Sequence, residues 1–270
     1  MEVPGITYAD WEQVFLPLYA AKYNLDVLHC TSNTAPLLYR GHTVVTLHDV
    51  IFLEPGKQVN TSNWYQFLGK VYRKMIVPAS IRKAKHIVTV SNFEKDRIKE
   101  VLGITGDNIS VVYNAFGKHF KNNIGFKDLD KIKEKYKLPE HYIFYIGNTD
   151  PKKNIYKTLR AYRIYCIKVP TPLPLVIADI SPEFLENILE ATNTTTLRQN
   201  IRLTGYIHNT DLPGIYKAAS LFLYPSLRES FGIPLLESMA CGTPVITSNT
   251  SALPEVAGNA AMLVDPTNEK

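Results

Sequence analysis

Short apolar runs alternate with longer stretches of helical periodicity along most of the 270-residue chain. In the first part, these runs predict buried strands at 26–30, 43–47, 86–90 and 109–113. Helices are expected between them, at 5–24 with a bend near Pro17, at 63–77, at 79–84, and from Ser91 to about 102. Such an alternation is typical of one doubly wound parallel sheet.

A polar, lysine-rich segment from 117 to 140 interrupts the alternation, and the domain junction is placed at 121–139. A first Rossmann-like domain is expected at 1–120 and a second at 140–270. The second repeats the alternation of strands and helices, which predicts an α/β fold for both. Its strands are expected at 142–146, 173–178, 201–203 and 221–224, and its helices at 131–137, 155–169, 182–192 and 211–219.

The stretch 221–246 predicts a strand, a loop, a short helix and a further strand. Pro234 suits the first turn of that helix, whereas Gly242 and Pro244 end it. In a parallel sheet, ligands bind beyond the carboxyl ends of the strands. The backbone N–H groups from Phe231 to Pro234 would therefore face an anion such as a diphosphate.

Two carboxylates, Glu229 in the loop and Glu237 one turn into the helix, flank this predicted anion site. A carboxylate repels phosphate, so each is expected to accept hydrogen bonds from hydroxyl groups. A nucleotide sugar has that pattern, with sugar hydroxyls and ribose hydroxyls on either side of a diphosphate. The simpler interpretation is that Glu237 only complements the helix dipole and Glu229 is a solvated loop residue.

The run Glu229-Ser230-Phe231-Gly232-Ile233-Pro234-Leu235-Leu236-Glu237, followed by Met-Ala-Cys-Gly-Thr-Pro-Val-Ile, resembles the donor-site signature of the family-4 glycosyltransferases. The segments 203–206, 252–258 and 263–266 extend the resemblance. It implies a GT-B fold, in which two Rossmann-like domains face each other across a cleft. It also implies an acceptor-side first domain, a donor-binding second domain, and transfer with retention of anomeric configuration.

The loop 147–154 lies between the first strand and the first long helix of the second domain. Gly147 allows the chain to turn tightly, and Lys153 supplies a positive charge at the helix entrance. The loop resembles the family's donor loop, with Lys153 at the position of the diphosphate-binding lysine. Many members have an arginine where this chain has Asn148, and Lys152 could compensate. A lysine in such a loop can also be merely solvated.

His48 and Asp49 follow the strand at 43–47. They resemble the His-Asp pair of the mannosyltransferase-like branch of this family. The resemblance implies that His48 orients the transferred sugar, and Asp49 would fix the tautomer of its ring. The alternative is a histidine that only caps a loop. The mannosyltransferase-like pair makes GDP-mannose the first expected donor, followed by UDP-sugars.

Together these features predict a retaining glycosyltransferase that moves a sugar, mannose first, from a nucleoside diphosphate sugar to an acceptor hydroxyl in cell-surface polysaccharide or glycoconjugate assembly. Glu229, His48 and Lys153 are the expected catalytic residues. A lysine and a helix N-terminus would neutralise the diphosphate, and we find no Asp-x-Asp motif that would hold a metal, so neither a metal nor a cofactor beyond the donor is expected. The expected donor-binding residues are Gly147, Asn148, Lys152, Lys153, Tyr206 near the base, Ser230, Phe231, Gly232, Ile233 and Glu237.

The composition limits the cellular compartment and the classes of partner that are expected for the protein. The chain is 45% hydrophobic and 20% charged, and its net charge of +5 does not indicate nucleic-acid binding. No apolar run approaches the ~20 residues of a membrane span. Three scattered cysteines favour a reduced, cytoplasmic protein.

The basic residues are concentrated in one segment, because no acidic residue lies between Glu54 and Glu94. Aromatic and apolar residues are interleaved with lysine and arginine there, so residues 57–85 are predicted to contact an anionic membrane near a glycan or lipid-linked acceptor. The protein would then be peripheral at the inner face of the membrane. The alternative is an ordinary amphipathic helix that packs on its own sheet.

Both ends of the chain are expected to be short relative to this family. A nucleotide-sugar-binding protein or subunit without independent transferase activity is therefore a second hypothesis, and a nucleotide-sugar epimerase of similar architecture is a third. Binding of a donor without release of nucleoside diphosphate would favour the second hypothesis. Release of the nucleotide in the presence of an acceptor would favour the transferase.

Overall fold

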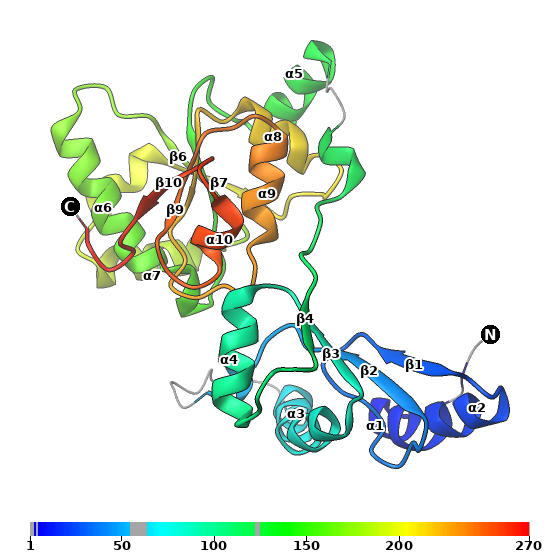
Figure 1. The fold of residues 1–270 in the computed structure, drawn as a ribbon. Coiled ribbons are helices and arrows are strands. Elements are labelled where there is room, and N and C mark those ends of the chain that lie inside the picture. The colour runs from blue at the N-terminus through cyan, green and yellow to red at the C-terminus, as the bar shows by residue number, and fades with distance from the viewer. Residues whose placement is uncertain (1–2, 4, 55–63, 122–124, 270) are drawn as a thin grey trace. The chain divides into compact units, whose positions relative to one another are not determined.

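The computed structural model describes residues 3, 5–54, 64–121 and 125–269. Its internal contacts divide the chain into two compact units, Met1–Tyr113 and Asn114–Lys270 (Figure 1). In those described ranges, no helix combines the length and the apolar character that crossing a membrane requires.

The segment predicted as a junction, 121–139, belongs to the second unit by its contacts. Helix α5 (Phe126–Lys135) packs on α8 (Leu212–Ala218) of that unit. A Cβ atom on Gly214 would lie 2.4 Å from Cδ1 of Ile132, so this glycine allows the two helices to approach closely. Phe120, in the preceding turn η3 (Lys118–Lys121), is buried in the same core. Three lysines of α5, Lys127, Lys131 and Lys135, are exposed to solvent.

The first unit contains one sheet of four parallel strands in the order β1-β2-β3-β4 (Figure 1). Each strand lies at a predicted apolar run. The strands are β1 (Val27–Cys30), β2 (His42–Thr46), β3 (His86–Thr89) and β4 (Ile109–Val111). The other elements are α1 (Tyr8–Asp10), the π-helical η1 (Trp11–Phe15), α2 (Leu16–Lys22), η2 (Ile51–Leu53), α3 (Trp64–Lys83) and α4 (Asn92–Leu102).

Burial alternates along the strands of this sheet. The residues on one face, including Cys30, Val45 and Ile87, pack with α3 and α4 in a single buried cluster. The opposite face carries exposed or half-buried positions such as His29 and Thr46, which hydrogen-bond each other at 2.8 Å. A doubly wound sheet would be covered on both faces. The prediction of a doubly wound sheet is therefore not met by the described helices of this unit, because α2, α3 and α4 all pack in one core on the same face of the sheet.

Two prolines affect the helices of the first unit differently. The bend predicted near Pro17 corresponds to η1, where the Leu16 amide donates to the Trp11 carbonyl immediately before the proline. The predicted break between 77 and 79 is wrong, because α3 continues through Pro78. Val77 and Ile81, on either side of this proline, are both buried in the core. Their burial favours one continuous helix over the lost backbone hydrogen bond.

The second unit contains six parallel strands in the order β10-β9-β8-β5-β6-β7. The strands are β5 (Ile143–Ile146), β6 (Leu175–Ala178), β7 (Ile201–Gly205), β8 (Leu221–Tyr224), β9 (Val245–Ser248) and β10 (Met262–Val264). The other elements are η4 (Pro151–Lys153), α6 (Ile155–Lys168), α7 (Pro182–Ala191), η5 (Thr195–Asn200), α9 (Ile233–Ala240) and α10 (Leu253–Ala257), besides η3, α5 and α8.

This second sheet is doubly wound, as predicted. One core contains Phe144 and Phe222 with α8, α9 and α10, and another contains Tyr145 with α6 and α7. From β5 the strand order runs to β6 and β7 on one side and to β8, β9 and β10 on the other. The order therefore reverses between β5 and β8, and the loops that leave these two neighbouring strands diverge there. Ligands of open α/β sheets bind at such a point.

Candidate functional site in the second unit

The loops that follow β5 and β8 are joined by hydrogen bonds at the reversal of strand order. The Leu227 amide donates to the Lys152 carbonyl at 2.7 Å. The Asn154 side-chain amide donates to the carbonyl oxygens of Pro225, at 3.0 Å, and of Pro266, at 2.8 Å. The topology and these bonds place the predicted donor loop and the predicted Glu229 motif side by side.

Local backbone geometry sets the position of Lys153. Asp150 caps η4 by accepting from the Lys152 amide at 3.0 Å, and Asn154 then adopts φ +67°. The Tyr145 hydroxyl donates to the Lys153 carbonyl at 2.8 Å. Hydrogen bonds at the Lys152 amide and the Lys153 carbonyl therefore fix the backbone from which the Lys153 side chain extends.

Gly147 is required in this loop because it has no side chain. Its φ lies outside the left-handed region, so the tight turn expected there is not what requires glycine. A Cβ atom would lie 3.1–3.2 Å from side-chain atoms of Tyr145, Ile177 and Ile180. Close packing against β6 explains the glycine.

Lys153 and Glu229 form an ion pair, with Nζ 2.7 Å from Oε1. Their side chains are 13% and 11% exposed. Lys153 Nζ also donates to the Tyr224 hydroxyl at 2.8 Å and lies 4.8 Å from the centroid of that ring. Burial, and then the neighbouring Glu229, raise the pKa of Tyr224 well above its ordinary value, so the phenol stays neutral. The two residues with the strongest predicted roles are thus in direct contact.

The backbone around Glu229 is also fixed. The Glu229 amide donates to Ser251 Oγ at 3.1 Å, and the Ala252 amide donates to the Glu229 carbonyl at 3.4 Å. Gly232 has φ +105° at the entrance to α9, and a Cβ atom there would lie 2.8 Å from Leu253 Cδ2. Only glycine fits this turn, which brings the start of α9 to the end of β8.

Glu237 lies in α9, where the Tyr216 hydroxyl donates to its Oε2 at 3.3 Å. Burial raises the pKa of Glu237, and the hydrogen bond from Tyr216 opposes that rise. A carboxylate that is only part-solvated and has one neutral hydroxyl partner is suited to accept further hydrogen bonds from ligand hydroxyls. The geometry is compatible with the ribose-binding role expected for it.

The remaining donor-binding candidates of this unit differ in their contacts and in their exposure to solvent. Asn148 accepts from the Asp150 amide at 2.9 Å, so its side chain stabilises the loop. Lys152 Nζ lies 3.6 Å from Asp150 Oδ2. Tyr206 follows β7, two strands away from β5, and its side chain is 74% exposed beside His208. In the motif, Phe231 is buried, Ser230 is half-buried and Ile233 is exposed.

His48 and Asp49 lie in the first unit, after β2. His48 Nε2 donates to the Thr31 carbonyl at 3.0 Å, and its amide donates to Asn33 Oδ1 at 2.7 Å. Asp49 Oδ1 accepts from the Ile51 amide at 3.1 Å. The expected role of Asp49 in setting the tautomer of His48 is therefore corrected. A carbonyl oxygen only accepts, so Thr31 places the proton on Nε2.

Sequence reasoning missed four residues that shape the site, namely Tyr224, Asn154, Ser251 and Tyr216. Each uses a polar atom of a buried or part-buried residue to hold a predicted site residue or its loop. A tyrosine that ends an otherwise apolar strand, as Tyr224 does, was the available signal. The partners of such a polar atom depend on contacts between distant segments.

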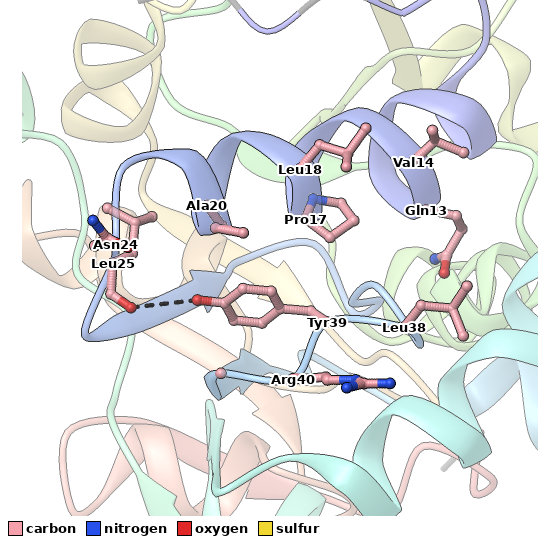
Figure 2. A pocket seen from close by; sticks show the side chains of 12 residues that line it. Gln13, Val14, Pro17, Leu18, Ala20, Asn24, Leu25, Leu38, Tyr39 and Arg40 are labelled. Atoms are coloured by element: carbon pink, nitrogen blue, oxygen red, sulfur yellow. Dashed lines mark hydrogen bonds between the residues drawn. The ribbon is translucent and has the colours of Figure 1, made fainter.

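Two hollows in the structure are lined by neither Lys153 nor Glu229. One of about 730 Å³ in the first unit is lined mainly by apolar residues of α2 and of the loop 38–41 (Figure 2). Two of the lining residues are joined by a hydrogen bond, in which the Tyr39 hydroxyl donates to the Leu25 carbonyl at 3.4 Å. Another, of about 370 Å³, lies beside α6 and residues 264–269. Neither contains the Lys153–Glu229 pair, and the chemistry of that pair makes it the stronger candidate site.

No cluster of three His, Cys, Asp or Glu side chains that could hold a metal ion occurs within the described ranges. Lys153 is the cation of this candidate site, and Glu229 and Glu237 are its carboxylates. This arrangement can bind a ligand that carries both an anionic group and hydroxyl groups.

Comparison with known proteins gives the family. Residues 126–270 match the family model "Glycosyl transferases group 1", and residues 4–116 match "Glycosyltransferase Family 4". The O-antigen chain mannosyltransferase B of Escherichia coli is 32% identical over 83% of this chain and 57% of its own length. The O-antigen chain mannosyltransferase RfbU of Salmonella typhimurium is 30% identical over 92% of this chain and 64% of its own. The chain thus spans less than two thirds of these relatives.

Solved structures show the fold. A glycosyltransferase from Rickettsia africae superposes with a TM-score of 0.70 at 23% identity, over 94% of this chain and 66% of its own. Anabaena HepE in complex with UDP gives a TM-score of 0.71 at 17% identity, over 94% of this chain and 68% of its own. The predicted α/β fold of the GT-B class is confirmed, with one parallel sheet in each unit. Because the first family model covers more than half of the sequence, the chain belongs to the group 1 glycosyltransferases.

Proposed function

We propose that this protein is a retaining glycosyltransferase that moves a sugar from a nucleoside diphosphate sugar to an acceptor hydroxyl. One observation carries the proposal. A lysine and a glutamate from two separate motifs meet at 2.7 Å where the strand order of the second unit reverses. That position is where an α/β sheet binds nucleotides.

The proposed chemistry breaks the bond between the anomeric carbon and the diphosphate oxygen, and forms a bond from that carbon to the acceptor oxygen. The acceptor hydroxyl releases its proton, and the diphosphate leaves with additional negative charge. Lys153 and the backbone amides near Phe231 and Gly232 stabilise that charge. Glu229 holds hydroxyls of the sugar, Glu237 those of the ribose, and Tyr206 contacts the base. His48 of the first unit, the acceptor-side domain in this proposal, orients the transferred sugar.

Mannose is the proposed sugar, with GDP-mannose as the first donor and UDP-sugars as the second. The names of the relatives support mannose, because two of them are O-antigen chain mannosyltransferases. The same names support a role in the assembly of a cell-surface polysaccharide, with a glycan or lipid-linked acceptor. Anabaena HepE, a structural neighbour, binds UDP, so UDP-sugars are proposed as the second class of donor.

Thermal stabilisation by nucleotide sugars tests this proposal without knowledge of the acceptor. A ligand that binds the folded protein at 100 times its Kd stabilises it by about 2.7 kcal/mol. GDP-mannose is expected to raise the unfolding temperature more than UDP-glucose or ATP does. The same screen on Lys153→Ala is expected to show no shift. If no nucleotide sugar stabilises the wild type, the donor site proposed here is wrong.

The second candidate function is a nucleotide-sugar-binding subunit without independent transfer. The observation in its favour is that Lys153, Glu229 and Glu237 all lie in the second unit, so a donor can bind there whether or not transfer follows. Release of GDP from GDP-mannose upon addition of glycan acceptors separates the two candidates. Stabilisation by the donor without any release would establish binding alone.

We further propose that α3 contacts an anionic membrane surface. Five apolar side chains spaced three or four residues apart form an exposed stripe along its first part, with Trp64 71% and Met75 69% exposed. The stripe consists of Trp64, Phe67, Leu68, Val71 and Met75. Arg73 and Lys74 are exposed on the same turns. An apolar stripe with flanking cations is typical of helices that lie on anionic lipid.

The second part of α3 fits the alternative interpretation, since Val77 and Ile81 pack in the core of the first unit. The helix therefore divides into a packed part and an exposed part. Residues 57–63 of the predicted segment 57–85 lie outside the described residues.

Vesicle co-sedimentation tests this surface. Binding to phosphatidylglycerol vesicles is expected to exceed binding to phosphatidylcholine vesicles and to weaken at high salt. The double variant Trp64→Ser, Met75→Ser should reduce binding by at least about tenfold, because burial of one large apolar side chain contributes about 1.5–3 kcal/mol.

Ile167→Ser, at a position of α6 that is 73% exposed, serves as the matched control and should bind like the wild type. Should the double variant change the oligomeric state but leave vesicle binding intact, the stripe joins protein subunits and the membrane proposal fails.

A further inference from the structure

Lys153 and Glu229 pair with each other inside the candidate site. Lys153 Nζ contacts the Glu229 carboxylate at 2.7 Å and the Tyr224 hydroxyl at 2.8 Å. In the proposed function, however, the lysine binds the diphosphate and the glutamate binds the sugar. Each side chain is therefore the other's partner, and a ligand that binds both would exchange these partners for its own groups.

The backbones of both residues are fixed, so the exchange falls on the side chains. Lys153 is held through its carbonyl by Tyr145, and Glu229 through its amide by Ser251. Among the described residues, Lys153 is the cation within ion-pair distance of the Glu229 carboxylate. A ligand that draws Lys153 away leaves this carboxylate without its counter-ion.

The consequence differs between the donor and the nucleotide that remains after transfer. Glu229 is only 11% exposed, and a largely buried carboxylate is costly unless it is paired or hydrogen-bonded. A nucleoside diphosphate alone would take Lys153 and leave Glu229 with the neutral Tyr224 hydroxyl but without a cation, next to a second anion. A nucleoside diphosphate sugar would take Lys153 and also offer hydroxyl donors to Glu229.

We propose that the Lys153–Glu229 ion pair makes the site discriminate against free nucleoside diphosphate and in favour of the intact nucleotide sugar. This inference rests on the proposed function. After transfer, the sugar no longer occupies Glu229, and re-formation of the pair competes with the diphosphate for Lys153. The pair thereby weakens binding of the product and promotes its release.

Titration calorimetry with two ligand pairs, GDP with GDP-mannose and UDP with UDP-glucose, tests the inference. In the Glu229→Gln variant Lys153 loses its counter-ion, so the affinity for the free nucleoside diphosphate should rise, on the order of tenfold. The affinity for the nucleotide sugar should stay equal or fall. The ratio of the two dissociation constants, which favours the sugar in the wild type, is expected to shift toward the free diphosphate.

A double-mutant cycle separates this inference from the proposed function. Lys153→Ala should weaken binding of the free diphosphate, and adding Glu229→Gln to it should then have no effect. If Lys153→Ala leaves that binding unchanged, the diphosphate site itself is wrongly placed. If Lys153→Ala weakens it but Glu229→Gln does not strengthen it, only the discrimination by the ion pair is refuted.

Two further variants complete the test. Glu229→Ala removes the carboxylate without adding an amide and should also strengthen binding of the free diphosphate. Glu186→Gln, on α7, removes the carboxylate of an exposed ion pair to Arg198 of η5, where the two groups lie 2.6 Å apart. It should leave both affinities unchanged, and a rise in this control equal to that of Glu229→Gln would overturn the inference.

Discussion

Lys153→Ala is expected to abolish measurable sugar transfer, with a fall in turnover of at least about 10²–10³-fold. The alanine removes the cation that neutralises the departing diphosphate. It also leaves Glu229, which is largely buried, without the ion-pair partner at 2.7 Å. Release of nucleoside diphosphate from a nucleotide sugar in the presence of an acceptor measures the effect.

Lys157→Ala is the matched control for this prediction, because it removes a lysine from the first turn of α6, four residues beyond Lys153 of η4. The Lys157 ammonium group is exposed and donates to the Thr267 carbonyl at 2.8 Å, away from Glu229. Its turnover should equal that of the wild type. Near wild-type turnover of Lys153→Ala, with the protein folded, would show that Lys153 has no part in the reaction.

Phe222→Ala is expected to have the largest effect on stability, lowering the free energy of unfolding by about 3–5 kcal/mol. Phe222 is fully buried in the middle of β8 and contacts the rings of Phe144, Tyr216 and Tyr224. Deletion of the ring leaves a cavity that β-sheet neighbours cannot fill. Urea denaturation of the full chain, followed by circular dichroism, measures the loss.

Phe222 also connects stability to the candidate site, since its ring stacks on Tyr224 at a centroid distance of 5.5 Å. Donor binding should therefore weaken together with stability in Phe222→Ala. Ile167→Ala, on the exposed face of α6, controls for the loss of an apolar side chain and should change stability by no more than about 0.5 kcal/mol. A similar loss in both variants would contradict the assignment of Phe222 to the core.

Most strands could be predicted because a buried parallel strand is a continuous apolar run. The predicted bounds of β8, 221–224, coincide with Leu221–Tyr224, and the helix predicted at 155–169 is α6 (Ile155–Lys168). Errors arose where tertiary contacts override local preference. Burial of Val77 and Ile81 carries α3 through Pro78, where the sequence had predicted a break.

The candidate site divides in the same way. The motif order and spacing identified Lys153, Glu229 and Glu237, because nucleotide binding requires cations and carboxylates at the ends of particular strands. Spacing could not reveal that Lys153 and Glu229 contact each other, or that Tyr224 contacts the lysine. Those contacts join residues 76 and 71 positions apart in the chain.

By itself, the sequence of this protein determined the kind of elements, the family and the residue types of the site. Each of these depends on local periodicity or on a short ordered motif. Only the tertiary structure decided which side chains become partners, because β5 and β8 are neighbours through the reversal of strand order and not through the chain. The pairing of Lys153 with Glu229, and the discrimination inferred from it, follow from that neighbourhood.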